Sequence, residues 1–266
     1  MNVRVIFSTL TLLLMVVFTT TATSASEESS TVGNLNRLHL AVSSNFHTTL
    51  KSLSKLYSKT HPTTIIISSA STGKLTTQIR FGAPYDIFLA ADEKHPNLLI
   101  AEGLAFSDSQ YTYAQGQLVL ISKGLTASTA IEAIQSGHIN QLAIANHKTS
   151  PYGLIANIWL EQSRVQGSTI QKITSENISQ TWQHFQHGGV DAALVALSQV
   201  ILSKSKSKNN SPAYWLLPEK LNHQLTQSAV ILTSSQNKSA AEKFMTFLKS
   251  KIAKDFISKA GYRLEN

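Results

Sequence analysis

Cysteine is absent from this chain of 266 residues. Its absence excludes disulfide bonds, thiol catalysis and cysteine-based metal sites, and it also excludes a lipid anchor on an N-terminal cysteine. A chain of this length folds without disulfides because it buries a large apolar core. With 42% hydrophobic and 14% charged residues, the composition is that of a soluble globular protein with one large or two modest domains.

Long apolar runs are missing from every part of the chain except its N-terminus. There Arg4 precedes an apolar run over residues 5–18, and small and hydroxyl residues follow as far as Ala25. This order is typical of a secretory signal peptide, which we expect over residues 1–25. A single membrane anchor is the alternative, but the run covers 14 residues, whereas a spanning helix needs about 20. We therefore expect cleavage and a periplasmic location.

Acidic residues are few. The chain has 23 lysines and arginines against 15 aspartates and glutamates, a net charge of +8, which becomes +7 once Arg4 leaves with the signal peptide. A basic surplus steers a protein toward anions or membrane surfaces, although ordinary solubility is the simpler interpretation. The one lysine cluster, Lys204, Lys206 and Lys208, has no aromatic residues interleaved with it. Nucleic-acid binding is therefore not expected.

Strand and helix patterns alternate along the rest of the chain. Residues 63–68 are β-branched and continuous, as in a strand that is buried on both faces. Phe46, Leu50 and Leu53 recur at helical spacing before it. Repeated alternation of this kind predicts an α/β fold with mainly parallel sheets.

Two extended segments interrupt the alternation, at residues 111–122 and near residues 224–229. Two lobes joined by two such crossings form a hinge. We expect the first lobe to comprise residues 37–117 and 226–266, and the second lobe to comprise residues 118–225.

Four local predictions concern smaller features. We expect a turn over residues 147–153, a loop over residues 203–213, and a single long helix over residues 239–259 with one apolar face. Ser175 is a candidate N-cap for the helix that follows it.

Three hydroxyl-bearing turns are candidates for an anion site, because hydroxyls and free backbone N–H groups at a helix start suit an anion. Ser71 and Thr72 lie in one turn, Ser44 and Asn45 in a second, and Tyr152 in a third. Taken alone, each of the first two turns is more simply explained as a helix cap, and the third is as readily a plain turn with a packed aromatic. Parallel strands bring their carboxyl ends to one edge, however, so the first two turns are predicted to converge.

Catalytic and nucleotide-binding patterns are missing. The turn before Leu75 resembles the end of a phosphate-binding loop, but Ser68 replaces its first glycine and Leu75 replaces its magnesium-binding hydroxyl. No serine has the spacing of a nucleophile elbow. His184 and His187 have metal-ligand spacing, but a solvated helix face is favoured. Asp92 is expected to cap a helix rather than to act as an acid or base.

Several segments together carry a family resemblance. They are residues 70–75, 78–79, 82–92, 151–153, 177–180 and 195–199. From about Leu38 to the C-terminus the chain resembles the periplasmic molybdate-binding proteins of bacterial ABC transporters. The resemblance implies a two-lobed type II periplasmic binding protein with no enzymatic activity, which holds molybdate or tungstate and uses no other cofactor. It also implies a monomer that delivers its ligand to an ABC permease in the inner membrane.

The ligand donors that the resemblance implies are all uncharged. They are Ser44, the backbone of Asn45, Ser71 and Thr72 (which remain alternatives), the phenol of Tyr152 and the backbone N–H of Ile178. Some relatives carry a tyrosine where this chain has Ala196, and we infer that Tyr152 replaces it. The rim also differs at residues 147–150, where Lys148 stands in a run that is usually more apolar.

Donors without a carboxylate favour a fully deprotonated anion, because hydrogen phosphate needs an acceptor for its proton. The resemblance makes molybdate the leading ligand, and sulfate, which is also fully deprotonated, must then be rejected by size. A receptor for sulfate, thiosulfate or another oxyanion is the alternative among binding proteins. An exported enzyme that uses a serine or a bound metal, and a structural protein without a ligand, are the alternatives from other classes.

Overall fold

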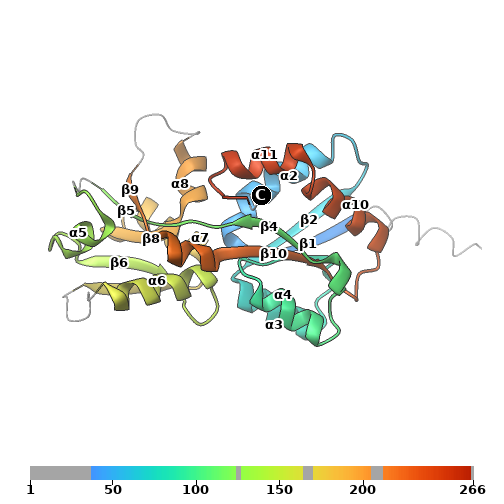
Figure 1. Cartoon of the computed structure of the whole chain (residues 1–266), viewed down its shortest axis with the longest axis horizontal. Coiled ribbons are helices and arrows are strands. Elements are labelled where there is room, and N and C mark those ends of the chain that lie inside the picture. Colours follow the sequence, from blue (N-terminus) through green and yellow to red (C-terminus); the bar gives the residue numbers. More distant parts are fainter. Residues whose placement is uncertain (1–36, 124–126, 164–169, 205–211, 265–266) are drawn as a thin grey trace, which may run out of the picture.

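The computed structural model describes residues 37–123, 127–163, 170–204 and 212–264. Within these ranges the chain forms two five-stranded sheets that lie side by side, each covered by helices (Figure 1). The expected signal peptide, together with Lys206 and Lys208, lies outside the described residues. Across the described part, helices are too short or too polar to cross a bilayer.

The first sheet has the strand order β2-β1-β3-β10-β4. Its strands are β1 (Arg37–Ser43), β2 (Thr64–Ala70), β3 (Ile87–Leu89), β4 (Tyr111–Gln115) and β10 (Thr226–Ile231). One face is covered by α2 (His47–Tyr57), α10 (Lys238–Leu248) and α11 (Lys251–Lys259), and the other by α3 (Thr72–Arg80) and α4 (Lys94–Ala101). Two 3-10 turns, η1 (Ser44–Phe46) and η2 (Ser107–Ser109), complete this part, which we call lobe 1.

The second sheet has the order β7-β6-β8-β5-β9. Its strands are β5 (Leu118–Ser122), β6 (Gln141–Ala145), β7 (Gln171–Ser175), β8 (Ala192–Ala196) and β9 (Ala213–Leu216). The helices α5 (Ala130–Gln135) and α6 (Pro151–Gln162) pack on one face, and α7 (Ile178–Gln186) and α8 (Leu197–Lys204) pack on the other. With α9 (Glu219–Asn222) and η3 (His223–Leu225), these elements form lobe 2.

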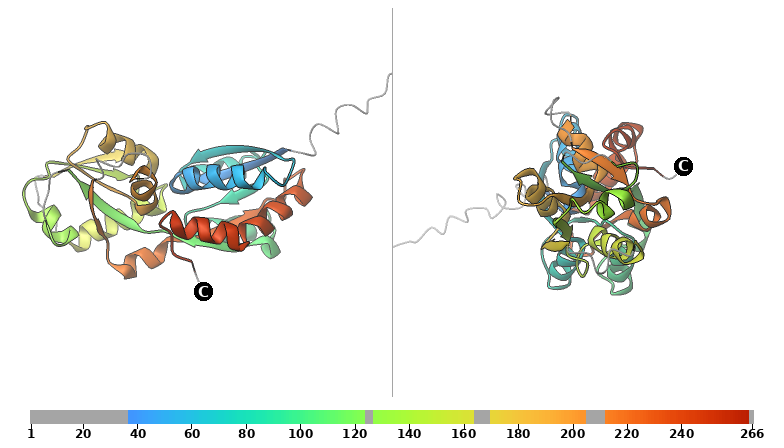
Figure 2. Two further views of the ribbon diagram at one scale, coloured as in Figure 1. Left: turned by 90° about the horizontal axis from the view of Figure 1, so that it is seen from above. Right: turned by 90° about the vertical axis from the view of Figure 1, so that its left-hand side faces the viewer.

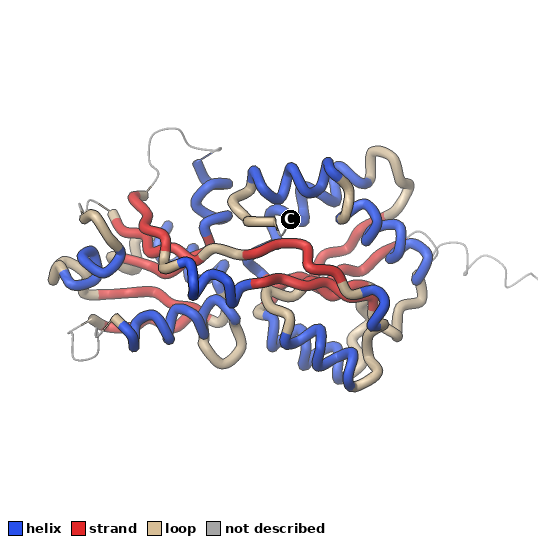
Figure 3. Tube along the Cα trace, in the orientation of Figure 1, coloured by secondary structure: helices blue, strands red, loops and turns tan. Residues whose placement is uncertain are grey.

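The chain crosses between the lobes twice, from β4 to β5 and from η3 to β10, and the crossings run side by side through the centre of the molecule (Figures 2 and 3). The backbone N–H of Gly116 on the first crossing donates to the carbonyl of Leu225 on the second, at 2.9 Å. Two adjacent crossings tie the lobes together while leaving them able to rotate as rigid bodies, which is the geometry of a hinge.

The two-lobed α/β architecture expected from the sequence is confirmed. The expectation of mainly parallel pairing needs refinement, because each sheet combines two parallel and two antiparallel strand pairs. The antiparallel pairs involve the crossing strands β4, β5 and β10. A strand that enters from the neighbouring lobe runs against the local strand–helix–strand units, so its direction is set by the crossing.

Two of the local predictions were wrong about where helices begin and end. Residues 151–153 are the first turn of α6 rather than part of a loop, since Ser150 accepts from the N–H of Gly153 and Pro151 occupies the first helical position. The C-terminal helix is two helices, because the Ser250 side chain accepts from the N–H of Ala253 and starts a new helix there.

Lobe 2 differs from the sequence expectation in two further places. Residues 203–204, which were expected to begin a loop, are the end of α8. The N-cap of α7 is Asn177 rather than Ser175, since the Asn177 side chain accepts from the N–H groups of Ser179 and Gln180. The N-cap of α4 is Glu93 rather than Asp92, although the Asp92 side chain accepts from the N–H of His95 in the first turn at 3.1 Å.

Candidate functional site

All six predicted site residues are buried where the two lobes meet. Each is at most 7% exposed. The pairs Ser44–Asn45 and Ser71–Thr72 follow the carboxyl ends of the parallel strands β1 and β2, as the sequence predicted. In lobe 2, Tyr152 is the second residue of α6 and Ile178 is the first residue of α7.

Ser71 and Thr72 have opposite environments although they are adjacent. The Thr72 hydroxyl lies 2.5 Å from the Ser43 hydroxyl and accepts from the N–H of Ala91 at 3.3 Å. Ser71 occupies the N-cap position of α3, yet its side chain makes no capping bond, and its buried Oγ has no hydrogen-bond partner among the described residues. Thr72 therefore joins three strand ends within lobe 1, whereas the Ser71 hydroxyl remains available to a ligand.

Tyr152 lies at the centre of a polar network that spans both lobes. The amide nitrogen of Gln227 donates to its phenol oxygen at 3.2 Å, and that of Asn45 lies at 3.5 Å. The Asn45 amide also donates to Gln227 Oε1 at 2.9 Å. Because the phenol oxygen accepts from amides, its own O–H is free to donate to a further group. Burial, and secondarily the nearby Tyr262, holds the pKa of Tyr152 well above its ordinary value, so the phenol keeps that proton.

Gly116 allows the network to form. A Cβ added at this position would lie 2.1 Å from the phenol oxygen of Tyr152 and 2.6 Å from Gln227 Nε2. Any larger residue at this point of the crossing would displace the phenol. Glycine is therefore required here because the Tyr152 side chain lies close against the backbone, and not because of its backbone angles.

Ile178 presents a free backbone N–H. It is the first residue of α7, and the first N–H groups of a helix have no intrahelical acceptor. The Asn177 cap accepts from the next two N–H groups, at 3.0 and 3.1 Å, and leaves that of Ile178. The Gln199 side chain donates to the carbonyl of Ile178 at 3.2 Å and fixes this turn.

Direct contacts hold the lobes together around these residues. The N–H of Gly73 donates to the carbonyl of Thr149 at 2.9 Å. The Ser179 hydroxyl donates to the carbonyl of Ser44 at 3.0 Å. Lys74 forms an ion pair with Glu176 at 2.9 Å. The two lobes are thus closed on one another.

Several buried polar atoms at this junction have no hydrogen-bond partner in the part of the chain that the structure describes. Besides Ser71 Oγ they include the hydroxyls of Thr149 and Ser175, at loop and strand ends of lobe 2, and Asn45 Oδ1 in lobe 1. A buried polar group without a hydrogen bond costs free energy. Unpaired hydroxyls from both lobes meet at this junction, and this indicates that a polar ligand belongs between them.

The groups that the site makes available to a ligand are uncharged. Lys74 is already paired with Glu176, and Lys148 is exposed on the rim. Within the described residues, acidic and histidine side chains form no cluster that could hold a metal ion. His184 on α7 and His187 just beyond it are both exposed. The available groups are hydroxyls and backbone N–H groups at helix starts, which suit an anion.

Sequence reasoning missed the residues that orient the donors. Gln227 on β10 binds Asn45, Tyr152 and Tyr113, and it accepts from the Tyr113 hydroxyl at 2.9 Å. The Tyr262 hydroxyl donates to the carbonyl of Asn45 at 2.8 Å. These partners are remote in the sequence, and only a buried polar residue within an apolar strand, as Gln227 is, could have drawn attention.

Comparison with known proteins places these features in a family. Residues 38–263 match the family of bacterial extracellular solute-binding proteins. The molybdate-binding protein ModA of Rhodobacter capsulatus is 32% identical over 226 residues, covering 85% of this chain and 87% of the relative. ModA of Azotobacter vinelandii is 33% identical over 230 residues, covering 86% of this chain and 90% of the relative.

Solved structures agree in fold. The periplasmic molybdate-binding protein of Azotobacter vinelandii superposes with a TM-score of 0.79 at 31% identity, over 86% of this chain and 100% of that one. The sulfate-binding protein SubI of Mycobacterium tuberculosis has a TM-score of 0.70 at 14% identity, over 86% of each chain. At that identity the second likeness concerns the fold alone.

Proposed function

The chain belongs to the bacterial extracellular solute-binding proteins, and we propose that it captures molybdate in the periplasm for an ABC importer. The proposal rests on the two curated relatives named for molybdate binding, which match most of the chain. Those relatives are binding proteins rather than enzymes, and the absence of a nucleophile motif from the sequence agrees with them.

The observation that carries the proposal is the buried, unpartnered hydroxyl of Ser71 at the N-cap of α3. A side chain in this position normally accepts from the helix and stabilises it. This one does not, so its hydroxyl is available to donate to an oxyanion at a helix N-terminus, where the helix dipole also favours negative charge. The proposed ligand set is Ser44, the backbone of Asn45, Ser71, the phenol of Tyr152 and the N–H of Ile178.

Thr72 takes a different role in this proposal. Its hydroxyl already bonds within lobe 1, so of the two alternatives Ser71 is the donor to the ligand. Ala196 is fully buried in β8 and has no polar side chain. The phenol therefore comes from Tyr152, whose O–H is left free by its amide partners.

Uncharged donors also argue for the class of anion. A buried dianion is stable only when hydrogen bonds replace its hydration, and charge-assisted bonds from hydroxyls and N–H groups do so. None of the proposed ligand residues carries a carboxylate, so none accepts the proton of hydrogen phosphate as a carboxylate does. Sulfate has the same charge as molybdate but is smaller, and lobes closed for the larger anion hold it more loosely. Tungstate matches molybdate in size and charge, and we propose that it also binds.

Calorimetry with the mature chain tests the ligand. Molybdate and tungstate are expected to bind tightly with one ion per chain, and sulfate and phosphate to compete only weakly. Trp182 lines a groove of about 270 Å³ between the lobes beside Ser44, so its fluorescence provides an independent signal. Tight sulfate binding without tight molybdate binding would overturn the proposal and favour a sulfate or thiosulfate receptor.

We further propose that the chain is exported as a monomer, loses residues 1–25, and delivers its ligand to an ABC permease of the inner membrane. The apolar N-terminal run and the family of the chain support this proposal. N-terminal sequencing of the protein from an osmotic-shock fraction is expected to begin near residue 26, and size-exclusion chromatography to give the mass of one chain. An intact N-terminus in the membrane fraction would contradict it.

A further inference from the structure

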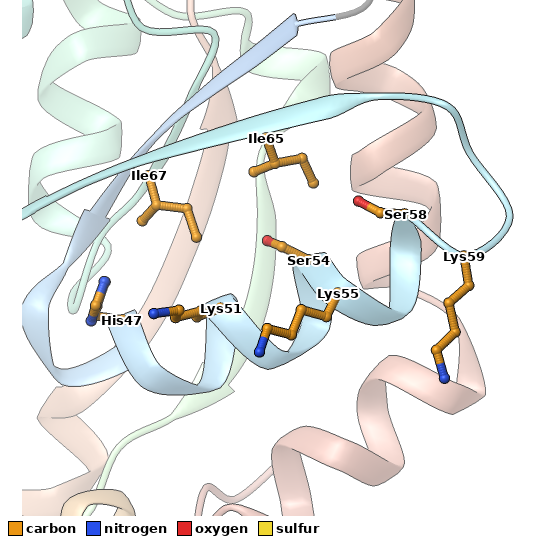
Figure 4. Close-up of a pocket in the computed structure, with 8 residues that line it drawn as sticks. All are labelled: His47, Lys51, Ser54, Lys55, Ser58, Lys59, Ile65 and Ile67. Carbon is orange, nitrogen blue, oxygen red and sulfur yellow. The ribbon is translucent and has the colours of Figure 1, made fainter.

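A groove of about 590 Å³ lies on lobe 1 between α2 and β2 (Figure 4). His47 at one end of it also lines the groove beside Ser44. Ile65 and Ile67 extend from β2 toward the helix and form its apolar wall. The facing wall is formed by α2, where Ser54 is buried and its hydroxyl has no partner.

The charge of the groove is of one sign. Lys51 and Lys55 on α2, and Lys59 just beyond it, line the groove, together with His47 at the other end of the helix. The lining includes no acidic residue. Among the described residues, none of the three lysines forms an ion pair. Three exposed and unpaired lysines beside an apolar wall attract an anionic partner that also has apolar contacts to offer.

The strand beside the groove is the edge of its sheet. β2 ends the strand order of lobe 1, and its described partner is β1 alone. Its outer side therefore presents backbone N–H and C=O groups that can pair with another strand. Added strands of this kind obtain affinity from the main chain and specificity from alternate side chains.

The spacing of Lys51 and Lys55, which are four apart on α2, matches that of an extended chain. Residues four apart on a helix are separated by about 6 Å along its axis. Alternate side chains of a strand, which lie on one face, are separated by about 6.6 Å. A strand paired with β2 would thus place every second side chain on the face that carries Ile65 and Ile67. Two carboxylates would then be in step with Lys51 and Lys55, and a third would extend toward Lys59, which follows the end of α2.

We propose that this groove binds an extended acidic segment of a partner protein, which adds a strand to β2 and pairs alternate carboxylates with Lys51, Lys55 and Lys59. Intervening side chains lie on the opposite face. The three lysines are not among the proposed ligand residues of the oxyanion.

Fluorescence anisotropy with a synthetic peptide tests the proposal. The probe alternates glutamate with valine and carries three glutamates, and its control has glutamine in place of glutamate. The mature chain is expected to bind the probe and not the control, with an affinity that falls as salt rises. The combined variant Lys51→Gln, Lys55→Gln and Lys59→Gln is expected to weaken binding about tenfold, as three exposed charge pairs predict.

A matched variant controls for net charge. It removes three charges from α10 and α11 by Lys243→Gln, Lys254→Gln and Lys259→Gln. These lysines are exposed and form none of the ion pairs of the described part. This variant is expected to bind the probe as the parent does. If both triple variants weaken probe binding equally, the proposed site in the groove is overturned, because the net charge of the protein then attracts the probe without a specific site. Molybdate binding is expected to be unchanged in both, so failure here is distinguishable from failure of the proposed function.

Backbone pairing has a test of its own. Two versions of the probe carry N-methyl groups on alternate residues, one version blocking each edge of the peptide. Strand addition predicts that one version fails to bind and the other binds normally, whereas a contact through charge alone treats both alike and overturns strand addition. Binding of anionic phospholipid vesicles instead of the probe would assign the groove to a membrane. Much tighter probe binding by a chain that begins at Arg37 would assign the groove to the chain's own N-terminal segment.

Discussion

Replacement of Ser71 by alanine and of Thr72 by valine separates ligand binding from folding at two adjacent positions. Ser71→Ala removes a hydroxyl that makes no bond within the protein. Thr72→Val removes one that lies 2.5 Å from the Ser43 hydroxyl and accepts from the N–H of Ala91. Both changes delete one oxygen and preserve most of the side-chain volume, so the difference between them reports the partners of that oxygen.

The expected magnitudes follow from those partners. A hydrogen bond to a charged group is worth about 1.5–3 kcal/mol, so Ser71→Ala is expected to weaken molybdate binding by roughly 10- to 150-fold. The ligand-free protein should lose no stability, because no protein partner is left unsatisfied. Thr72→Val strands the Ser43 hydroxyl and the Ala91 N–H in the interior, at a cost of about 1–3 kcal/mol in the free energy of unfolding.

The assay pairs calorimetric titration of molybdate with urea unfolding of the ligand-free protein. Ser71→Thr restores the hydroxyl and is expected to recover most of the lost affinity. The assignment would be refuted if Thr72→Val abolished binding at unchanged stability while Ser71→Ala bound normally. It would also be refuted if Ser71→Ala destabilised the ligand-free protein, since its hydroxyl would then have a structural partner.

Three further predictions concern the surroundings of the site. Gly116→Ala places a methyl group 2.1 Å from the phenol oxygen of Tyr152. Overpacking of this kind costs about 1–3 kcal/mol, so calorimetry is expected to show molybdate binding weakened from several-fold to roughly 100-fold. Burial raises the pKa of Tyr262 to about 12, whereas an unfolded tyrosine titrates near 10. The contribution of Tyr262 to stability is therefore full below pH 10 and lost as the pH rises toward 12, and Tyr262→Phe should flatten the fall in the free energy of unfolding between these pH values in a series of urea unfolding curves. Lys74 and Glu176 are 44% and 62% exposed, so Glu176→Gln should weaken molybdate binding only slightly and only at low salt, and a large loss at high salt would contradict this.

Much of the fold was predictable because its signals are local. The β-branched run at residues 63–68 and the helical spacing of Phe46, Leu50 and Leu53 depend only on nearby residues, and both became the expected elements. Boundaries were less secure. Pro151 was read as part of a turn, but it occupies the first position of α6, and proline suits both places. The long apolar face of residues 239–259 concealed the new helix start at Ser250.

Strand direction and the partners of single side chains required the tertiary structure. The sequence placed hydroxyls after the ends of β1 and β2 because parallel strands end at one edge, and it identified a family whose members bind an oxyanion. It left Ser71 and Thr72 as equal alternatives, since neighbouring hydroxyls look alike along the chain. They differ only because folding brings Ser43 and Ala91 to Thr72 and brings no protein partner to Ser71. In the same way, folding brings Gln227 from the far end of the chain to Asn45 and Tyr152. Such pairings depend on the three-dimensional path of remote segments, which no local pattern records.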